Sequence, residues 1–402
     1  MRLYNKPPPG SQNVIEFEIP PSNRFLITRD PDHIKTILTT KFADFGKGPT
    51  FHSLWKSFFD LAKFERGVQS FVAQLPRSGE TVQLMGLLYR ATLDMTTVPT
   101  GPQRRAFIKA FDEVQKTQMR IVMMYPFDAF IDRKEYYRGI KTLEAFIMPF
   151  VEKTLTLTAE EIEEIGKSDN DFTFLHGLAS FRRDPKVIRD QIMAVLLAGR
   201  DTTAGTPSWA FYELAAYPEN WARLREEVLS TVGSHKAPTY DDLKNLRYLR
   251  YMLNETLRLY PAVPYNMRAA LQDTTLPGGP GRSDNAVLKG DTVAYSPYVM
   301  QRRRDLYPPV TAEFADPLIF SPERWYSWQP KSWEFLPFNG GPRICVGQDF
   351  TMTEMAYFMV RILQRYERLE YRGDWEAQLH KADIVARPSL GVPVALFEAG
   401  HA

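Results

Sequence analysis

Phe338-Asn339-Gly340-Gly341-Pro342-Arg343-Ile344-Cys345-Val346-Gly347 is the stretch that says most about this fold, and it contains the only cysteine among the 402 residues. One cysteine cannot form an internal disulfide or a multi-cysteine metal site. Cys345 is therefore a packing residue, a reactive thiol or the single axial ligand of a haem iron. Its neighbours favour the ligand, because Gly341 and Gly347 let the backbone approach a flat group and Arg343 places a permanent cation near the sulfur.

The residues that follow this stretch predict a helix. Apolar side chains recur at helical spacing from Met352 through Met355 and Met359 to Leu363. A cysteine just ahead of a helix N-terminus meets unpaired N–H groups and the positive end of the helix dipole, and both favour a thiolate. An isolated cysteine is also commonly a small buried hydrophobic residue, so the flanking residues decide the interpretation.

Taken with its flanks, the pattern Phe-x-x-Gly-x-Arg-x-Cys-x-Gly at residues 338–347 resembles the haem-binding loop of the cytochrome P450 family. The resemblance implies that Cys345 is the axial thiolate ligand of haem b. It also implies a cofactor-binding loop around the cysteine that consists of Phe338, Gly341, Arg343 and Gly347.

The composition is that of an ordinary globular protein. The chain has 24% charged residues and a formal net charge of +2, which gives no electrostatic reason to expect nucleic-acid binding. No stretch approaches about 18 uninterrupted apolar residues, and the first residues do not form a signal peptide. We therefore expect a cytoplasmic or peripherally bound protein, whereas the family it resembles is associated with the endoplasmic-reticulum membrane.

Helical periodicity dominates the middle of the chain, and strand patterns lie near its two ends. The clearest helix start is Asp184-Pro185, which opens a long helix over about 185–215. The other expected elements are strands at 14–19, 24–28 and 292–295, a helix from Asp30-Pro31 through Leu38, mainly helix over 55–260 including a helix at 241–260, and a C-terminal hairpin of 384–387 with 392–397. The predicted fold class is mainly α with small β-sheets (α+β) in a single domain over 1–402. By resemblance this is the cytochrome P450 fold, partly truncated.

Glu255-Thr256-Leu257-Arg258 places a carboxylate and a guanidinium on one helix face. Alone, this spacing indicates a surface ion pair worth at most about 1 kcal/mol. The resemblance implies more, because the family joins such a pair to an arginine from a downstream Pro-Glu-Arg motif, which here is Pro322-Glu323-Arg324. We expect Glu255, Arg258 and Arg324 to form a buried structural network.

Ala198-Gly199-Arg200-Asp201-Thr202-Thr203 lies within the long predicted helix. An Asp-Thr pair competes with the helical backbone for hydrogen bonds, so a capped helix end is one interpretation. The resemblance implies instead an oxygen-activation helix. In that interpretation Thr202 delivers protons, Asp201 relays them from solvent, and Gly199 leaves room for dioxygen.

Two further arginine positions follow the Glu-x-x-Arg helix. By resemblance Arg268, in Pro264-Tyr265-Asn266-Met267-Arg268, binds a haem propionate together with Arg343. Arg302-Arg303-Arg304 is a basic run, which is usually a solvated face and is alternatively a docking site for an acidic reductase.

Four tracts resemble the fungal branch that hydroxylates n-alkanes and fatty acids: Phe174-Leu175-His176, residues 196–203, residues 264–268 and Arg302-Arg303. The resemblance implies an oxidoreductase, a monooxygenase acting on paired donors that inserts one oxygen atom from O2 into a terminal or near-terminal C–H bond. The expected partners are a small hydrophobic substrate, O2 and an NADPH-dependent flavoprotein reductase. Ala198, Val263 and Leu390 are the candidate substrate contacts.

Three features depart from the family pattern. The chain starts at its first strand without a membrane anchor, and the segments after Trp55 and near 96–101 are short, so the usual Trp-x-x-x-Arg helix is missing. Pro207 lies in the oxygen-activation helix, where it removes one backbone hydrogen bond. The alternative hypothesis is therefore a shortened, catalytically impaired haem-binding or non-catalytic fragment. A haem peroxygenase is a third interpretation, which the Asp201-Thr202 pair disfavours.

Overall fold

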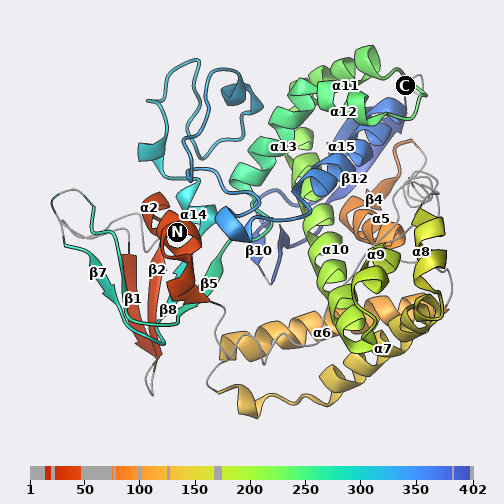
Figure 1. Ribbon diagram of the computed structural model, residues 1–402. Coiled ribbons are helices and arrows are strands. Elements are labelled where there is room, and N and C mark those ends of the chain that lie inside the picture. Colours follow the sequence, from red (N-terminus) through yellow and green to blue (C-terminus); the bar gives the residue numbers. More distant parts are fainter. Residues whose placement is uncertain are drawn as a thin grey trace. The chain divides into compact units, whose positions relative to one another are not determined.

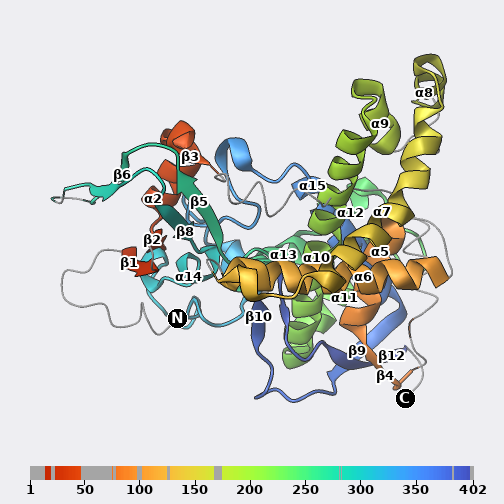
Figure 2. The ribbon, with the colours of Figure 1, turned by 90° about the horizontal axis from the view of Figure 1, so that it is seen from below.

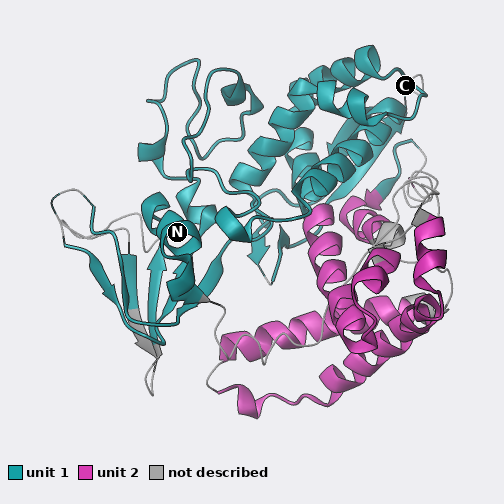
Figure 3. Cartoon of the chain, in the orientation of Figure 1, with its two compact units in different colours: residues 1–52, 78–81, 205–402 teal, residues 53–77, 82–204 magenta. Residues whose placement is uncertain are grey.

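The structure is a computed structural model that describes residues 14–19, 23–46, 75, 78–96, 102–124, 127–166, 174–279, 281, 283–382 and 384–398. The predictions about the first residues, the segment after Trp55 and the contraction at 97–101 lie outside these ranges. The chain divides into two compact units (Figure 3): unit 1 comprises residues 1–52, 78–81 and 205–402, and unit 2 comprises residues 53–77 and 82–204. The single domain over 1–402 stays a prediction.

Unit 1 contains a five-stranded sheet with the order β1-β2-β8-β5-β3 (Figure 1). The strands β1 (Val14–Ile19) and β2 (Asn23–Thr28) pair antiparallel with Val14 opposite Thr28, which confirms the predicted pair of N-terminal strands. The strand β8 (Thr292–Tyr295) also occupies its predicted residues and runs parallel to β2. The remaining two strands are β5 (Asn266–Ala270) and β3 (Phe45–Gly46).

Short helices follow β2 as the sequence predicts. The side chain of Asp30 accepts a hydrogen bond from the backbone N–H of Asp32 and so caps α2 (Pro31–Lys35). The chain continues as a π-helical segment, η1 (Thr36–Thr40), and a 3-10 turn, η2 (Phe42–Asp44). Their apolar side chains pack with those of the sheet in a buried core that includes Ile34, Leu38 and Phe45.

The helical part of unit 1 consists of α11 (Pro218–Thr231), α12 (Tyr240–Asn245), α13 (Arg247–Leu259) and α15 (Gln348–Arg365). The predicted helix at 241–260 is two helices, because Leu246 leaves the helical conformation at ψ 85°. A capping box between Thr239 and Asp242 starts the first of them. The helix predicted after Gly347 is confirmed as α15.

Short elements complete the described part of unit 1. These are β6 (Thr274–Leu276) paired with β7 (Asn285–Val287), the helix α14 (Pro297–Met300), the 3-10 turns η4 (Arg304–Leu306), η5 (Pro322–Tyr326) and η6 (Gly341–Arg343), and β4 (Thr81–Gln83), which begins at the boundary between the units.

The predicted C-terminal hairpin is wrong. The strand β11 (Ala386–Pro388) pairs with β10 (His380–Ala382), whereas β12 (Pro393–Glu398) pairs with β9 (Tyr366–Tyr371). Pro388 and Pro393 lack the N–H groups that would open a ladder between the two segments. In addition, Val394 and Leu396 are fully buried, so the pairing follows burial.

Unit 2 is helical in its described part. It contains α5 (Leu84–Thr96), α6 (Pro102–Met124), the turn η3 (Asp128–Phe130), α7 (Lys134–Leu155), α8 (Ala159–Gly166) and α9 (Phe174–Phe181). The helices α6 and α7 approach closely at Gly139, where an added Cβ would lie 2.6 Å from Val114 Cγ2. The helices α8 and α9 also lie side by side (Figure 2). No described helix is long and apolar enough to cross a membrane.

The helix α10 (Pro185–Ala216) confirms the long helix predicted from Asp184-Pro185. The side chain of Asp184 accepts from the backbone N–H groups of Lys186 and Val187 at its start. The helix continues through Pro207 and well beyond Thr203, so the Asp201-Thr202 pair is not a helix end.

The last turns of α10 contribute to a buried polar cluster of unit 1. The hydroxyl of Tyr260 donates to Glu213, and the Tyr260 ring stacks on Trp209 at 4.1 Å between centroids. Burial raises the pKa of Glu213 to about 7, and the neighbouring Glu255 charge adds to the effect, while Tyr260 and Arg302 oppose it. Burial beside Arg302 also lowers the pKa of His380 to about 4.

Replacing Glu213 by glutamine should make the protein progressively more stable, relative to the unmodified chain, as the pH rises from about 4.5 through about 7. The folded chain holds a proton that the unfolded chain releases above its ordinary pKa, so the unmodified protein loses stability over this window. Over this pH window, the free energy of unfolding of the variant should rise by about 3 kcal/mol relative to that of the unmodified protein.

Urea unfolding of both proteins at a series of pH values measures this difference. His380 titrates with the opposite slope, because its folded pKa is lowered, but it is present in both proteins and cancels. A stability difference that does not change with pH would contradict the account.

Candidate active site

The loop before α15 presents the thiol of Cys345 at the surface of unit 1. The backbone N–H of Cys345 donates to the carbonyl oxygen of Phe338 at 2.9 Å, and that of Ile344 donates to Gly341 at 3.0 Å. These bonds fold the loop back on itself, with Gly347 as the residue ahead of α15. The cysteine is exposed rather than packed in the core, which rules out a buried structural thiol.

The two glycines of the loop have different surroundings. Gly341 has φ +61°, and an added Cβ would lie 2.6 Å from the carbonyl oxygen of Leu38 and 2.5 Å from Thr39 Oγ1. The close approach there is to the η1 segment of the chain itself. A Cβ at Gly347 would lie 4.0 Å from Cys345 Sγ, so this glycine borders the thiol.

Apolar side chains stand exposed beside the thiol. Val346 is fully exposed, and Ile344 and Phe350 are 50% and 40% exposed. Contiguous exposed apolar residues of this kind mark a surface for an apolar partner. Their position on either side of Cys345 fits the flat apolar face of a haem.

Arg268 supplies a buried cation near the loop. Its side chain is 4% exposed and donates to Asn266 Oδ1 at 2.9 Å and to the carbonyl of Met267 at 2.7 Å. Burial lowers the pKa of Arg268, and the positive charge of Arg343 lowers it further. Two guanidinium groups that repel each other, neither with a carboxylate partner among the described residues, fit the propionates of a haem.

The acid–alcohol pair of α10 lies in unit 2. Asp201 is buried; its Oδ2 accepts from Gln115 Nε2 at 2.9 Å and its Oδ1 lies 3.5 Å from Arg200 Nη1. The hydroxyl of Thr202 donates to the carbonyl of Ala198. At Gly199, an added Cβ would meet no atom within 4 Å, which leaves open space one turn before the pair.

The partners of Asp201 are not apparent from the sequence. Arg200 is buried and binds Asp112 of α6 at 2.7 Å, and Gln115 lies on the same helix. No local pattern marks Asp112 or Gln115, because their role depends on how α6 packs against α10. Gln115 and Arg200 therefore fix the position of the Asp201 carboxylate, and Asp112 anchors Arg200.

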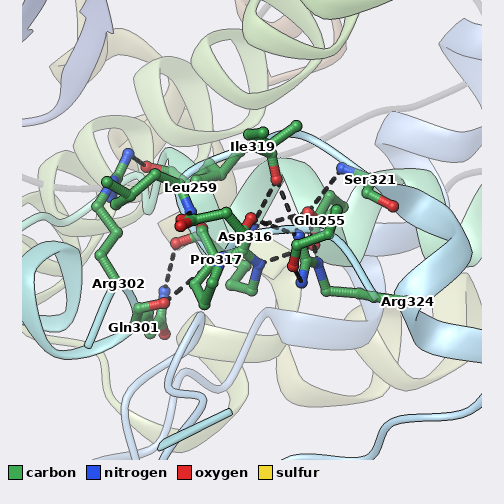
Figure 4. Close-up of polar contacts among 12 residues, drawn as sticks. Glu255, Leu259, Gln301, Arg302, Asp316, Pro317, Ile319, Ser321 and Arg324 are labelled. Carbon is green, nitrogen blue, oxygen red and sulfur yellow. Dashed lines mark hydrogen bonds and ion pairs between the residues drawn. The ribbon is translucent and has the colours of Figure 1, made fainter. Parts of the chain in front are cut away.

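The structure brings Glu255, Arg258 and Arg324 together in the core of unit 1. Figure 4 shows Glu255 and Arg324 of this network. All three side chains have no exposed surface. Arg258 forms a bidentate pair with Glu255 through Nε at 2.8 Å and Nη2 at 2.7 Å, and Arg324 Nε lies 2.9 Å from Glu255 Oε1. Ser321 N and Trp325 Nε1 complete the hydrogen bonds to this carboxylate.

The network ties α13 to the segment that precedes the cysteine loop. Arg258 donates to the carbonyl of Pro317 at 2.7 Å, and Arg324 donates to the carbonyls of Ala315, Asp316 and Ile319. Burial disfavours the charged form of Glu255, yet Arg258 and Arg324 hold its pKa below the usual value. The carboxylate is therefore ionised and fully hydrogen-bonded.

The interpretation of Arg302-Arg303-Arg304 as a solvated face or docking site is wrong for the first residue. Arg302 is buried and donates to the carbonyls of Leu259 and Tyr298, with its guanidinium 3.8 Å from the Tyr298 ring centroid. Arg303 binds Asp305, and Arg304 pairs with Asp316. A cation–π interaction with the Tyr298 ring stabilises the buried Arg302 guanidinium. The sequence pattern alone does not reveal this contact.

Replacing Glu255 by glutamine should lower the free energy of unfolding by about 3–5 kcal/mol, because two guanidinium groups are left without a buried counter-charge. Urea unfolding followed by far-UV circular dichroism measures the loss. Arg304→Ala is the matched control, because its pair with Asp316 is 68% exposed on the arginine side and should cost less than about 1 kcal/mol. Equal losses in the two variants would argue against the network.

Comparisons with known proteins agree with this geometry. The family model described as Cytochrome P450 matches residues 83–392. Cytochrome P450 monooxygenase pvhE of Talaromyces variabilis is 42% identical over 94% of this chain and 81% of that protein, and Cytochrome P450 52A13 of Debaryomyces hansenii is 35% identical over 87% and 77%. The crystal structure of the cytochrome P450DA heme domain superposes with a TM-score of 0.74 at 18% identity, covering 96% of this chain and 89% of that one.

These matches confirm the predicted fold class and cofactor. Members of the family are oxidoreductases that bind haem b through a cysteine thiolate, use O2 and receive electrons from a redox partner. The sequence identity extends over most of the chain and over more than three quarters of each named relative. This chain therefore belongs to the cytochrome P450 family of monooxygenases.

Proposed function

We propose that this monooxygenase hydroxylates a long-chain aliphatic substrate, a fatty acid or an n-alkane, at or near its terminal carbon. The observation that carries the proposal is the exposed Cys345 thiol ahead of α15, near two arginines without carboxylate partners in the described part of the chain. The substrate class rests on the resemblance to the fungal alkane and fatty-acid branch and on the relatives of the 52A series from yeasts.

The haem would be held by residues of unit 1. Cys345 would supply the thiolate ligand of the iron, and Arg268 and Arg343 would bind the propionates. The turn from Phe338 to Gly347 supports the cysteine, and Gly347 leaves the position beside its sulfur free of a side chain. When bound, the haem activates dioxygen for insertion into a C–H bond.

Asp201 and Thr202 are the proposed proton-delivering pair. Thr202 carries a hydroxyl on α10, and this hydroxyl donates a hydrogen bond to the carbonyl of Ala198, one turn earlier in the helix. Asp201 returns a proton to that hydroxyl, and Gln115 and Arg200 keep its carboxylate in place. The role of this pair is to move protons from solvent towards the reacting oxygen.

The substrate would contact apolar side chains. Ala198, Val263 and Leu390 are all exposed, and none of these side chains carries a polar group. They fit an aliphatic chain better than a polar or charged one. The proposed electron donor is an NADPH-dependent flavoprotein reductase, the redox-partner class implied by the resemblance.

An impaired fragment is the less favoured function. In the described residues the ligand loop, the Glu255 network and the acid–alcohol pair are all formed. A non-catalytic protein would not need two cations near Cys345 or a buried carboxylate beside Thr202.

Turnover with a saturated long-chain fatty acid and with the matching n-alkane tests the substrate. With haem, a flavoprotein reductase and NADPH, the expected product is an alcohol at the terminal or adjacent carbon, identified by mass spectrometry. A steroid of similar apolar area is the control. Preferential hydroxylation of the steroid, with no product from the fatty acid or the n-alkane, would overturn the proposed substrate class.

Thr202→Ala should divert reducing equivalents from product to hydrogen peroxide, because the hydroxyl that passes the proton is lost. The share of NADPH recovered as product should fall about tenfold or more. Thr203→Ala is the matched control, because the Thr203 hydroxyl is fully buried and forms no hydrogen bond with the described residues. Equal coupling in the two variants would exclude Thr202 from proton delivery.

A further inference from the structure

Asn339 has an unusual backbone conformation for a residue with a side chain. Its φ is +65°, and among the described residues only Trp333 shares such a value without being glycine. Asparagine tolerates this region better than most residues, because its short side chain can hydrogen-bond locally. Here the side chain does so within the cysteine loop.

The Asn339 amide bridges two parts of unit 1. Its Oδ1 accepts from the hydroxyl of Tyr295 at 3.0 Å, and its Nδ2 donates to the carbonyl oxygen of Arg343 at 3.1 Å. Arg343 is two residues from Cys345, so the bridge fixes the backbone from which both side chains extend. The neighbouring N–H of Cys345 is bound to Phe338, on the other side of Asn339.

Tyr295 connects the same bridge to the second arginine. It lies at the end of β8 opposite Asn266 of β5, and its side chain is 1% exposed. The Arg268 guanidinium lies 5.8 Å from the Tyr295 ring centroid. The β5–β8 pair therefore reaches the cysteine loop through one hydroxyl.

We infer that Tyr295 and Asn339 are positioning residues that set Arg268 and Arg343 in register with the Cys345 thiol, so that one haem is held by its propionates and its iron together. The inference rests on the proposed haem contacts of Arg268, Arg343 and Cys345. It concerns retention of the cofactor, and neither residue is given a part in the oxygen chemistry.

The conformation and the amide of Asn339 are separable by mutation. Asn339→Gly keeps the positive φ without strain and removes the bridge, whereas Asn339→Ala also imposes the strain. Tyr295→Phe removes only the hydroxyl. Because both Tyr295→Phe and Asn339→Gly break the same hydrogen bond, the double variant should behave like Asn339→Gly alone.

The test is the rate at which each holoprotein loses haem to an excess of apomyoglobin. Tyr295→Phe should lose haem about fivefold faster than the unmodified protein, the effect of one lost hydrogen bond. Asn339→Gly removes both hydrogen bonds of the amide, so it should lose haem at least as fast as Tyr295→Phe. Tyr136→Phe is the matched control, since this buried hydroxyl of unit 2 donates to the side-chain oxygen of Gln118 at 2.6 Å and should leave the rate unchanged. Thermal unfolding of the haem-free variants checks that each chain is folded.

The outcomes separate this inference from the proposed function. Unchanged haem loss in Tyr295→Phe or Asn339→Gly, or effects that multiply in the double variant, would overturn the bridge while the haem site stands. Fast loss in Asn339→Ala with a normal rate in Asn339→Gly would show that backbone conformation alone matters, which also overturns it. An unmodified chain that takes up no haem would instead refute the proposed haem site.

Discussion

The interaction on which the described part of unit 1 most depends is the Glu255 carboxylate held between Arg258 and Arg324. Taking three charges out of water costs more free energy than one ion pair returns, so such a cluster persists only when each polar atom has a partner. Here Ser321 and Trp325 donate the remaining hydrogen bonds to the carboxylate, and five backbone carbonyls accept hydrogen bonds from the guanidinium groups. The result is a rigid connection between α13 and the segment that leads to the cysteine loop.

Some charges of this protein are paired with opposite charges, whereas others have no counter-charge among the described residues. Glu255 is fully paired, whereas Arg268 and Arg343 repel each other without a carboxylate between them in the described residues. An anionic group bound beside these two cations would offset the free-energy cost of keeping them together. Arg302 shows a third arrangement, because carbonyls and the Tyr298 ring accept its charge in place of an anion, and burial lowers its pKa to about 10.

Much of the fold could be predicted from the sequence where the signal is local. Asp184-Pro185 and Asp30-Pro31 mark helix starts through their own side chains, and the cysteine loop carries its ligand, its cation and its glycines within ten residues. The prediction of a C-terminal hairpin is wrong because β11 pairs with β10 and β12 pairs with β9. The pairing of β12 buries Val394 and Leu396, and this burial depends on the tertiary structure. Gln115 reaches Asp201, and Asp112 reaches Arg200, only through helix packing. The burial of Arg302 depends on the ring of Tyr298. These contacts have no signature in the linear sequence.

The central claim is that the Cys345 loop builds a haem-thiolate site. The carbon-monoxide difference spectrum of the reduced, haem-loaded protein tests it most directly, recorded beside Cys345→Ala. The account predicts the strongly red-shifted Soret band of a thiolate-ligated haem in the unmodified protein and its loss in the variant. A band at the ordinary position in the unmodified protein, or the same red-shifted band in both proteins, would contradict it.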